Sequence, residues 1–348
     1  MFSCWWGSDI FSALHINGEA LFDLSAYRLF WDTMPDRNFM FMKAAVLKEK
    51  GRIQNIEITD VSKPSVKPNE VLVKVYAGGI NPVDYKIAEH GYFGTPMIMG
   101  SDISGIIEIV GNEIKNFKAG DEIIGSLEWQ KQSGFAEWVT TEEKYITIKP
   151  KNLAIADAAA IPMAGLTAWQ ALFDHIHLMA GQKIVIHAAA GGVGLFAVQF
   201  AKWKGALVIA TASERNIDFL KSVGADEVID YTKYKLSDTV KNVDAVLDTI
   251  SSAETQTLSL EVLKKGGYYV SIVSLNIPLD ENILSKYEVK GIKFLFQSNA
   301  EQLKQIVELI EEGKVKVIID RRFGMEQITE ALSYVKKGRT RGKNILNI

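Results

Sequence analysis

Cysteine is nearly absent from this sequence, since Cys4 is the only one in 348 residues. A single thiol cannot form an intramolecular disulfide, so the composition favours a reducing compartment and predicts a cytoplasmic protein. The same count excludes a zinc site that takes several thiolates from one chain.

Long apolar runs and an excess of positive charge are missing as well. No apolar run approaches the roughly 18 residues of a membrane span, so we expect no membrane partner. The net charge is −3, which argues against a nucleic-acid partner because such proteins usually present a basic face. Hydrophobic residues make up 47% and charged residues 23% of the chain, as in soluble globular proteins, and the length suits two domains.

Residues 1–41 differ in pattern from the rest of the chain. Polar residues interrupt every apolar stretch in this segment, which argues against a signal peptide. Strand-like alternation begins only at Met42. Two interpretations remain open: the functional chain begins at Met42 and residues 1–41 are an extension of unknown role, or these residues form an N-terminal helix that packs on the body.

Two patterns follow one another after Met42. Residues 43–150 contain short alternating segments separated by Gly, Pro and Asn turns, which predicts an antiparallel β domain. From about residue 157, apolar runs alternate with helical segments, which predicts βαβ units, a parallel sheet and an α/β fold class. Its strands are expected at 183–188, 206–211, 226–230, 243–248 and 267–273. A helix (300–312), a strand (315–319), a second helix (325–337) and a last strand (343–348) should complete the chain.

The most informative motif is the turn at 189–194, Ala-Ala-Gly-Gly-Val-Gly. A short apolar strand precedes it and a helix follows, in the order that a dinucleotide-binding fold requires. Gly191 lets the backbone approach a pyrophosphate, Gly194 allows close helix packing, and the helix N-terminus favours an anion. Other tight strand-to-helix turns rich in small residues look similar, and Ala189 replaces the usual first glycine. The second strand–helix unit downstream favours a cofactor site.

The tip of the second strand bears on the choice of nicotinamide cofactor. An NAD site usually has an acidic residue there, whereas Ser213 and Arg215 suit the 2′-phosphate of NADPH. Glu214 lies between them and would serve NAD if its side chain turned inward. A first-turn helix acid facing solvent is the alternative for Glu214, and it leaves NADPH as the predicted cofactor.

Several further segments accompany the glycine turn: 79–86 (Gly-Ile-Asn-Pro-Val-Asp-Tyr-Lys), 100–105 (Gly-Ser-Asp-Ile-Ser-Gly), 117–122, 164–169 and 224–231. Together they resemble the medium-chain dehydrogenase/reductases, and most closely the zinc-free quinone oxidoreductase (zeta-crystallin-like) and alkenal reductase branch. The resemblance runs from Met42 to the C-terminus.

This resemblance implies a GroES-like catalytic domain, formed by residues 42–163 and 295–348, around a Rossmann NADP-binding domain at 164–294. It also implies an active site in the cleft between them and a homodimer. Related alcohol dehydrogenases hold zinc near the positions of Asn81 and Ser101–Asp102, where this chain offers altered or non-ligating residues. We therefore expect no metal. Without a Lewis acid, a conjugated acceptor such as a quinone or enone is an easier hydride target than an alcohol or isolated carbonyl.

The resemblance also suggests roles on the catalytic side. The Asn81 amide would bond the nicotinamide ribose or the substrate oxygen, although Asn-Pro is also a common turn. Lys86 would donate to an anionic cofactor or a developing oxyanion, or else be a solvated helix charge. Tyr92 would belong to a lid over the substrate, or else pack in the ordinary way.

On the cofactor side, the family places a residue at the position of Tyr231 near the adenosine phosphate, and Thr167 near the nicotinamide ring. Ser274 should lie at the carboxyl edge of the parallel sheet. Arg339, Arg341 and Lys343 form a basic cluster, of which Arg339 is the candidate carried forward. The complete set of predicted cofactor-binding residues is Thr167, Ala190, Gly191, Gly192, Val193, Gly194, Ser213, Arg215, Tyr231, Ser274 and Arg339.

The predicted function is NADPH-dependent reduction of a quinone or α,β-unsaturated carbonyl by metal-free hydride transfer. Two alternatives stay open. A cofactor-binding redox sensor or structural protein with little turnover would keep the same glycine turn, and an NAD(P)-dependent alcohol dehydrogenase would use a different metal arrangement.

Overall fold

The computed structural model describes residues 15–16, 19–20, 40–129, 131–272 and 279–348. The chain divides into two units, Met1–Phe41 and Met42–Ile348. In the first unit, β1 (His15–Ile16) pairs antiparallel with β2 (Glu19–Ala20). The alternative of an N-terminal helix over residues 1–41 falls largely on residues outside those described.

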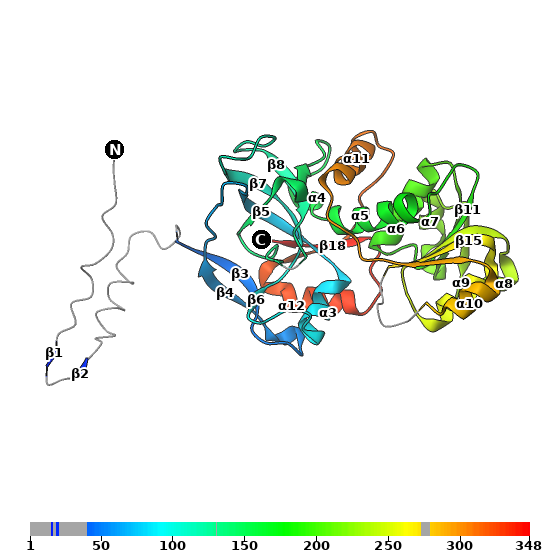
Figure 1. Ribbon diagram of the computed structural model, residues 1–348, viewed down its shortest axis with the longest axis horizontal. Helices are drawn as coiled ribbons and strands as arrows, with labels where there is room; N and C mark the ends of the chain where they lie inside the picture. The colour runs from blue at the N-terminus through cyan, green and yellow to red at the C-terminus, as the bar shows by residue number, and fades with distance from the viewer. Residues whose placement is uncertain (1–14, 17–18, 21–39, 130, 273–278) are drawn as a thin grey trace. The chain divides into compact units, whose positions relative to one another are not determined.

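A mostly antiparallel sheet forms the first half of the second unit, in the strand order β10-β8-β7-β5-β18-β17, with β9 also paired to β5. Figure 1 shows the last strand, β18, beside β5, although the two are far apart in the sequence. Burial alternates along the central strand β5: Val73 and Val75 are buried, whereas Lys74 and Tyr76 are exposed. This is the pattern of a strand with one face toward the core. The bounds are β5 (Val71–Ile80), β7 (Asp102–Val110), β8 (Glu122–Ser126), β9 (Trp138–Thr141), β10 (Ile146–Ile148), β17 (Ile319–Gly324) and β18 (Lys343–Asn347).

A smaller sheet, in the order β4-β3-β6, accompanies it. The bounds are β3 (Phe41–Leu47), β4 (Ile56–Ser62) and β6 (Met97–Ile98). The helices of this half of the fold are α3 (Pro82–His90), α4 (Ile155–Ala158), α11 (Ala300–Glu311) and α12 (Ile328–Lys336).

The second half is a parallel sheet in the order β13-β12-β11-β14-β15-β16. Helices cover both of its faces: Ile184 and Ile186 of β11 pack in the core that contains α5 and α6, whereas Val185 packs in the core that contains α8, α9 and α10. A doubly wound sheet buried on both sides explains the continuous apolar runs of its strands. The strands are β11 (Lys183–Ile186), β12 (Leu207–Ala212), β13 (Glu227–Asp230), β14 (Val243–Asp248), β15 (Leu263–Ser271) and β16 (Lys290–Lys293). The helices are α5 (Pro162–Trp169), α6 (Gly192–Trp203), α7 (Ile217–Ser222), α8 (Leu236–Thr239), α9 (Ala253–Val262) and α10 (Glu281–Tyr287).

The α/β class with one parallel and one antiparallel sheet is as predicted, but two details of the sequence interpretation are wrong. The strand expected at 315–319 lies at Ile319–Gly324 instead, because Val315 is buried in the core without belonging to a sheet strand. Alternating apolar residues indicate which positions are buried, but they do not by themselves show that the segment pairs with a neighbouring strand. The edge strand β16 was not anticipated, since Lys290-Gly-Ile-Lys has little apolar content.

No helix in the part of the chain that the structure describes is both long and apolar enough to cross a bilayer.

Candidate cofactor and active site

The glycine turn lies between β11 and α6, at the carboxyl edge of the parallel sheet. Gly191 is the N-cap of α6 and has extended backbone dihedral angles. A Cβ on Gly194 would lie 2.6 Å from the Ala189 Cα and 2.7 Å from the Ala188 carbonyl oxygen. Because both neighbours are backbone atoms, only glycine lets the first turn of α6 pack this closely on the preceding strand. The first N–H groups of α6, which have no partner within the helix, therefore lie among glycines, as an anion site requires.

A cavity of about 250 Å³ opens directly on this turn. Four predicted cofactor residues line it, namely Gly191, Gly192, Val193 and Gly194. The predicted catalytic residue Asn81 also lines it, as do the start of β18 and the loop before that strand. Residues that the sequence interpretation did not select also line the cavity: Ile80, Pro82, Ala164, Ala188, Thr249, Ile272, Val335, Gly338, Thr340, Gly342, Lys343 and Asn344.

Hydrogen bonds hold the glycine turn to the C-terminal strand. The Gly342 N–H donates to the Ala190 carbonyl at 2.9 Å, and Gly191 and Gly342 form an isolated parallel bridge. A Cβ on Gly192 would lie 2.8 Å from the Cδ of Lys343. The turn therefore packs directly against Gly342 and the aliphatic stem of Lys343.

A buried polar network begins at two of the lining residues, Asn81 and Lys343. Lys343 Nζ donates to the Ile80 carbonyl at 3.0 Å and to Asn81 Oδ1, and it lies 3.8 Å from Asp102 Oδ2. Asn81 Nδ2 donates to Asp102 Oδ2 at 2.9 Å and to the Gly79 carbonyl at 3.1 Å. Both N–H groups of the Asn81 amide are thus engaged within the protein, and its predicted bond to a ribose or substrate oxygen remains a prediction.

Burial governs the ionisation of this network. Desolvation raises the pKa of Asp84 to about 7. The hydrogen bond from the Asn81 N–H and the positive charge of Lys343 act in the opposite direction, but burial has the larger effect. Desolvation likewise raises the pKa of Asp102 and lowers that of Lys343, although each is partly offset by the opposite charge of the other. Asp84, Asp102 and Lys343 are all buried, and a buried charge is costly unless an opposite charge or hydrogen bonds compensate it. In the Lys343–Asp102 pair, each charge compensates the other.

The residues predicted to bind the 2′-phosphate follow β12 and β13. Ser213 is half-buried, Arg215 is exposed and Tyr231 is 62% exposed. The Glu214 carboxylate pairs with Lys233 Nζ at 2.7 Å. Lys233 is a second cation at this end of the sheet that the sequence interpretation overlooked, because it lies in a turn without a recognisable motif.

Two members of the basic cluster, Arg339 and Arg341, are hydrogen-bonded to residues 215–216, which follow β12. Arg215 donates to the Arg339 carbonyl at 3.0 Å, and Arg341 donates to Asn216 Oδ1 at 2.9 Å and to the Arg215 carbonyl at 3.0 Å. Of the three cations in the cluster, it is Lys343 that lines the cavity. Arg339 is exposed, and its cofactor contact stays a prediction.

Of the other predicted residues, Lys86, Tyr92, Thr167 and Ala190 are not among those that line the cavity. Lys86, on α3, is half-buried, and desolvation lowers its pKa. Tyr92 follows the same helix, is 57% exposed, and meets the His90 ring edge-to-face at 6.1 Å. Thr167 Oγ1 donates to the Met163 carbonyl at 2.6 Å within α5. Ser274 lies outside the described residues, and β15 ends at Ser271.

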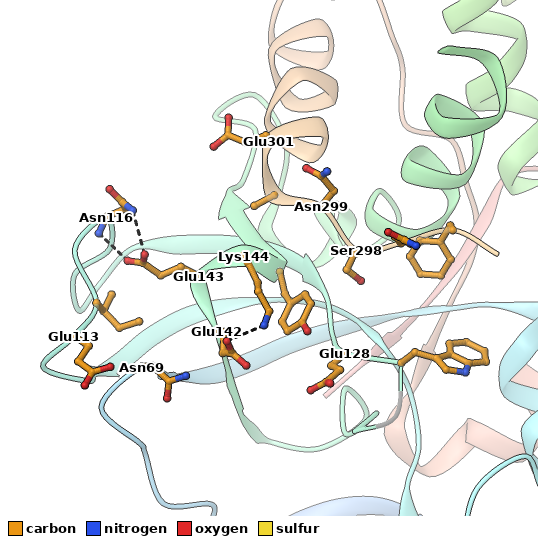
Figure 2. A pocket seen from close by; sticks show the side chains of 16 residues that line it. Asn69, Glu113, Asn116, Glu128, Glu142, Glu143, Lys144, Ser298, Asn299 and Glu301 are labelled. Carbon is orange, nitrogen blue, oxygen red and sulfur yellow. Dashed lines mark hydrogen bonds and ion pairs between the residues drawn. The ribbon is translucent and has the colours of Figure 1, made fainter. Parts of the chain in front are cut away.

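A larger hollow of about 910 Å³ occurs elsewhere, between the loops around β8 and β10 and the start of α11 (Figure 2). Five glutamates line it, Glu113, Glu128, Glu142, Glu143 and Glu301. The Glu143 carboxylate accepts hydrogen bonds from the Lys115 and Asn116 N–H groups, both at 2.8 Å. Carboxylates repel the phosphates of a dinucleotide, so the smaller cavity at the glycine turn is the candidate site although its volume is lower.

Comparisons with known proteins agree with this geometry. A family model described as an alcohol dehydrogenase GroES-like domain matches residues 67–157, and one described as a zinc-binding dehydrogenase matches residues 223–346. The chain is 34% identical to a 2-methylene-furan-3-one reductase of Solanum lycopersicum, over 88% of this chain and 79% of the relative. It is 33% identical to a chloroplastic NADPH-dependent alkenal/one oxidoreductase of Arabidopsis thaliana, with the same coverage.

Among solved structures, a quinone oxidoreductase from Coxiella burnetii superposes with a TM-score of 0.83 at 32% identity, over 88% of this chain and 99% of that one. The fold and the site therefore define a two-domain dehydrogenase with a dinucleotide-type turn. The chain belongs to the medium-chain dehydrogenase/reductase superfamily, which confirms the family predicted from the sequence motifs.

Proposed function

We propose that this protein reduces a quinone or an α,β-unsaturated carbonyl compound with NADPH, by hydride transfer that needs no metal. One observation carries the proposal: the glycine turn 191–194 and the Asn81–Lys343 pair line a single cavity. That arrangement brings a phosphate-binding helix N-terminus and a polar wall to one place. The names of the tomato, Arabidopsis and Coxiella relatives support an enone or quinone acceptor.

The charge arrangement beyond β12 supports NADPH over NADH. Glu214 is the acid that would otherwise bind the ribose hydroxyls of NAD, and its carboxylate is already paired with Lys233. Arg215 supplies positive charge two residues after Ser213, which suits a 2′-phosphate. Ser213, Arg215 and Tyr231 would hold the adenosine end, and the turn 190–194 would hold the pyrophosphate.

The donor set around Asn81 supports a metal-free reaction. Lys343 places an ammonium group on Asn81 Oδ1 and 3.8 Å from Asp102 Oδ2, and a cation bound at these oxygens would be repelled by it. Within the described ranges, no three His, Cys, Asp or Glu side chains form a group suited to a metal ion. We therefore keep the expectation from the sequence motifs that the reaction needs no zinc, although one matching family model is described as a zinc-binding dehydrogenase.

NADPH, when bound, supplies the hydride and its electron pair. The protein's contribution is to orient the acceptor against the cavity wall formed by Asn81 and Pro82 and to exclude water around it. Hydride addition at one end of a conjugated acceptor leaves negative charge on its oxygen, and a proton from solvent or from Lys86 completes the reduction. Tyr92 would belong to a lid over the acceptor.

The domain boundaries predicted from the sequence form part of the proposal. The antiparallel sheet takes its strands from 71–148 and from 319–347, and the parallel sheet takes its strands from 183–293. This supports a catalytic domain of residues 42–163 and 295–348 around a cofactor domain of residues 164–294. A homodimer and a cytoplasmic location remain predictions of the sequence interpretation.

The test is a panel of quinones, short enones, isolated aldehydes and alcohols, assayed with NADPH and NADH in parallel, with and without a strong chelator. We expect oxidation of NADPH with the conjugated acceptors, unchanged by the chelator. Loss of activity on chelation would contradict the metal-free reaction. Alcohol-dependent reduction of NAD would favour an alcohol dehydrogenase, and tight NADPH binding without turnover on any acceptor would favour a sensor.

A further inference from the structure

Lys343 is an ammonium group held in the interior of the protein beside the candidate site. The residue is only 5% exposed, lies at the start of β18, and lines the cavity together with the glycine turn. A buried lysine is retained without a large penalty only where its N–H groups and its charge are compensated. Here two acceptors and one carboxylate provide that compensation: the Ile80 carbonyl, Asn81 Oδ1 and Asp102.

The partners of Lys343 fix the orientation of the Asn81 amide. Lys343 is only a donor and the Asp102 carboxylate is only an acceptor, so the Asn81 oxygen must face Lys343 and its nitrogen must face Asp102. Rotation of the amide by half a turn would set N–H against N–H and oxygen against oxygen. The side chain is thus locked in one state at the cavity wall.

The network also joins segments that are far apart in the sequence. Asp102 Oδ1 accepts from the Met163 N–H, at the start of α5, at 3.0 Å. Asn81 precedes α3, and its backbone N–H donates to Asp84 Oδ2 at 2.7 Å. The stem of Lys343 meets the glycine turn at Gly192. One ammonium group therefore ties the cofactor turn to the wall from which α3 begins.

We propose that Lys343 is a positioning residue, which fixes Asn81 and the start of α3 against the glycine turn so that hydride transfer, and not cofactor affinity, depends on it. The inference rests on the proposed function. Its physical basis is that a displacement of about 1 Å between hydride donor and acceptor costs up to roughly 100-fold in rate, whereas dinucleotide affinity comes mainly from contacts elsewhere.

The test compares Lys343→Met with the wild-type protein. Methionine keeps the length and the apolar stem but removes the charge and the donors. We expect kcat with saturating NADPH and enone to fall by about 10- to 100-fold, while the Kd for NADPH from fluorescence titration changes by less than about threefold. The isotope effect on kcat with 4-deuterated NADPH should equal or exceed that of the wild type, because the slowed step is hydride transfer itself.

Lys149→Met is the matched control for general destabilisation. Lys149 is also buried, and its ammonium donates to the Pro150 and Leu153 carbonyls and pairs with Glu122 at 3.0 Å, outside the cavity lining. We expect a lowered Tm and unchanged kcat in this variant. Asp102→Asn, which alters one atom and leaves an acceptor for Met163, should also lower kcat and so covers the case in which Lys343→Met fails to fold.

Three results would overturn the inference. The Kd for NADPH could rise by tenfold or more in Lys343→Met at unchanged kcat, which would make Lys343 a cofactor ligand. Both constants could stay at wild-type values in Lys343→Met, or in Asp102→Asn if that is the folded variant, which would leave only a structural role. Lys149→Met could lose as much kcat as Lys343→Met, which would assign the effect to stability. An inactive wild type would instead contradict the proposed function, so the two failures are distinguishable.

Discussion

The backbone N–H of Gly342 donates to the carbonyl of Ala190 at 2.9 Å and so joins the end of the chain to its most informative motif. Gly342 has a φ of 91°, a left-handed value that favours glycine. The bond places β18 and its first residue, Lys343, against the cofactor turn. Four predictions follow from this arrangement and from the site around it.

Gly342→Ala should be one of the most damaging single-methyl changes in the protein. An added Cβ would clash with the Ile318 carbonyl oxygen, and the backbone conformation disfavours any side chain. We expect the free energy of unfolding to fall by more than about 3 kcal/mol in urea titrations, with weakened NADPH binding. Gly338→Ala is the control, since its φ is also positive, at 66°, but no atom lies within 4 Å of its Cβ. It should lose only about 1 kcal/mol, and equal losses in both variants would contradict the role of the clash.

Gly194→Ala should separate the turn from the helix that follows it. The new Cβ would press on the backbone of Ala188 and Ala189, so α6 has to move away from the strand. We expect the Kd for NADPH to rise at least about tenfold and the stability to fall by about 2 kcal/mol or more. Gly165→Ala, in α5, meets its nearest atom, the Cδ1 of Ile306, at an ordinary 3.4 Å, and should be neutral or slightly stabilising by calorimetry. Wild-type affinity in Gly194→Ala would argue against a cofactor at this turn.

Arg215→Ala should change the choice between the two nicotinamide cofactors. Arg215 is exposed beside Ser213, where a 2′-phosphate would lie. Loss of one charge-assisted interaction should raise the KM for NADPH about tenfold or more and leave the KM for NADH nearly constant. Glu214→Gln is the companion variant. If it weakens NADH binding and Arg215→Ala leaves NADPH unaffected, the assignment of these two side chains is reversed.

Asp84→Asn should have a pH-dependent effect on stability. Burial raises the pKa of Asp84 from 3.8 to about 7, so the folded protein binds this proton more tightly than the unfolded chain does. The stability that the protonated carboxyl contributes is complete below pH 3.8 and is lost as the pH rises through about 7. Asparagine, which stays neutral, should therefore gain about 2 kcal/mol relative to the wild type between pH 5 and pH 8.

Urea unfolding of Asp84→Asn at several pH values measures this gain. Asp60→Asn, at an exposed position in β4, is the control for removal of one carboxylate, and its free energy of unfolding should stay close to that of the wild type. A relative stability of Asp84→Asn that is constant with pH, or that falls as the pH rises, would contradict the buried state of Asp84.

Particular residues show how far the sequence interpretation reached. Gly191 to Gly194 were selected from a local motif and Asn81 from the family resemblance, and all of them line the cavity. Lys233 and Asp102 were not selected as functional, because neither carries a short-range signal: their partners, Glu214 and Lys343, come from other elements. Lys343 was seen only as one of three cations, and nothing in Arg-Thr-Arg-Gly-Lys distinguishes the buried side chain from the exposed Arg339.

The sequence alone determined the family, the α/β class and the strand–turn–helix motif, since these depend on apolar periodicity and on glycines that act over a few residues. Only the tertiary structure decided which charges face the cavity. The Asn81–Asp102–Lys343 network is assembled by strand pairing across more than two hundred residues, through the register of β18 against β5, where Asn344 pairs with Ile80. Register sets which side chain points inward, and long-range register is decided by the packing of the whole sheet.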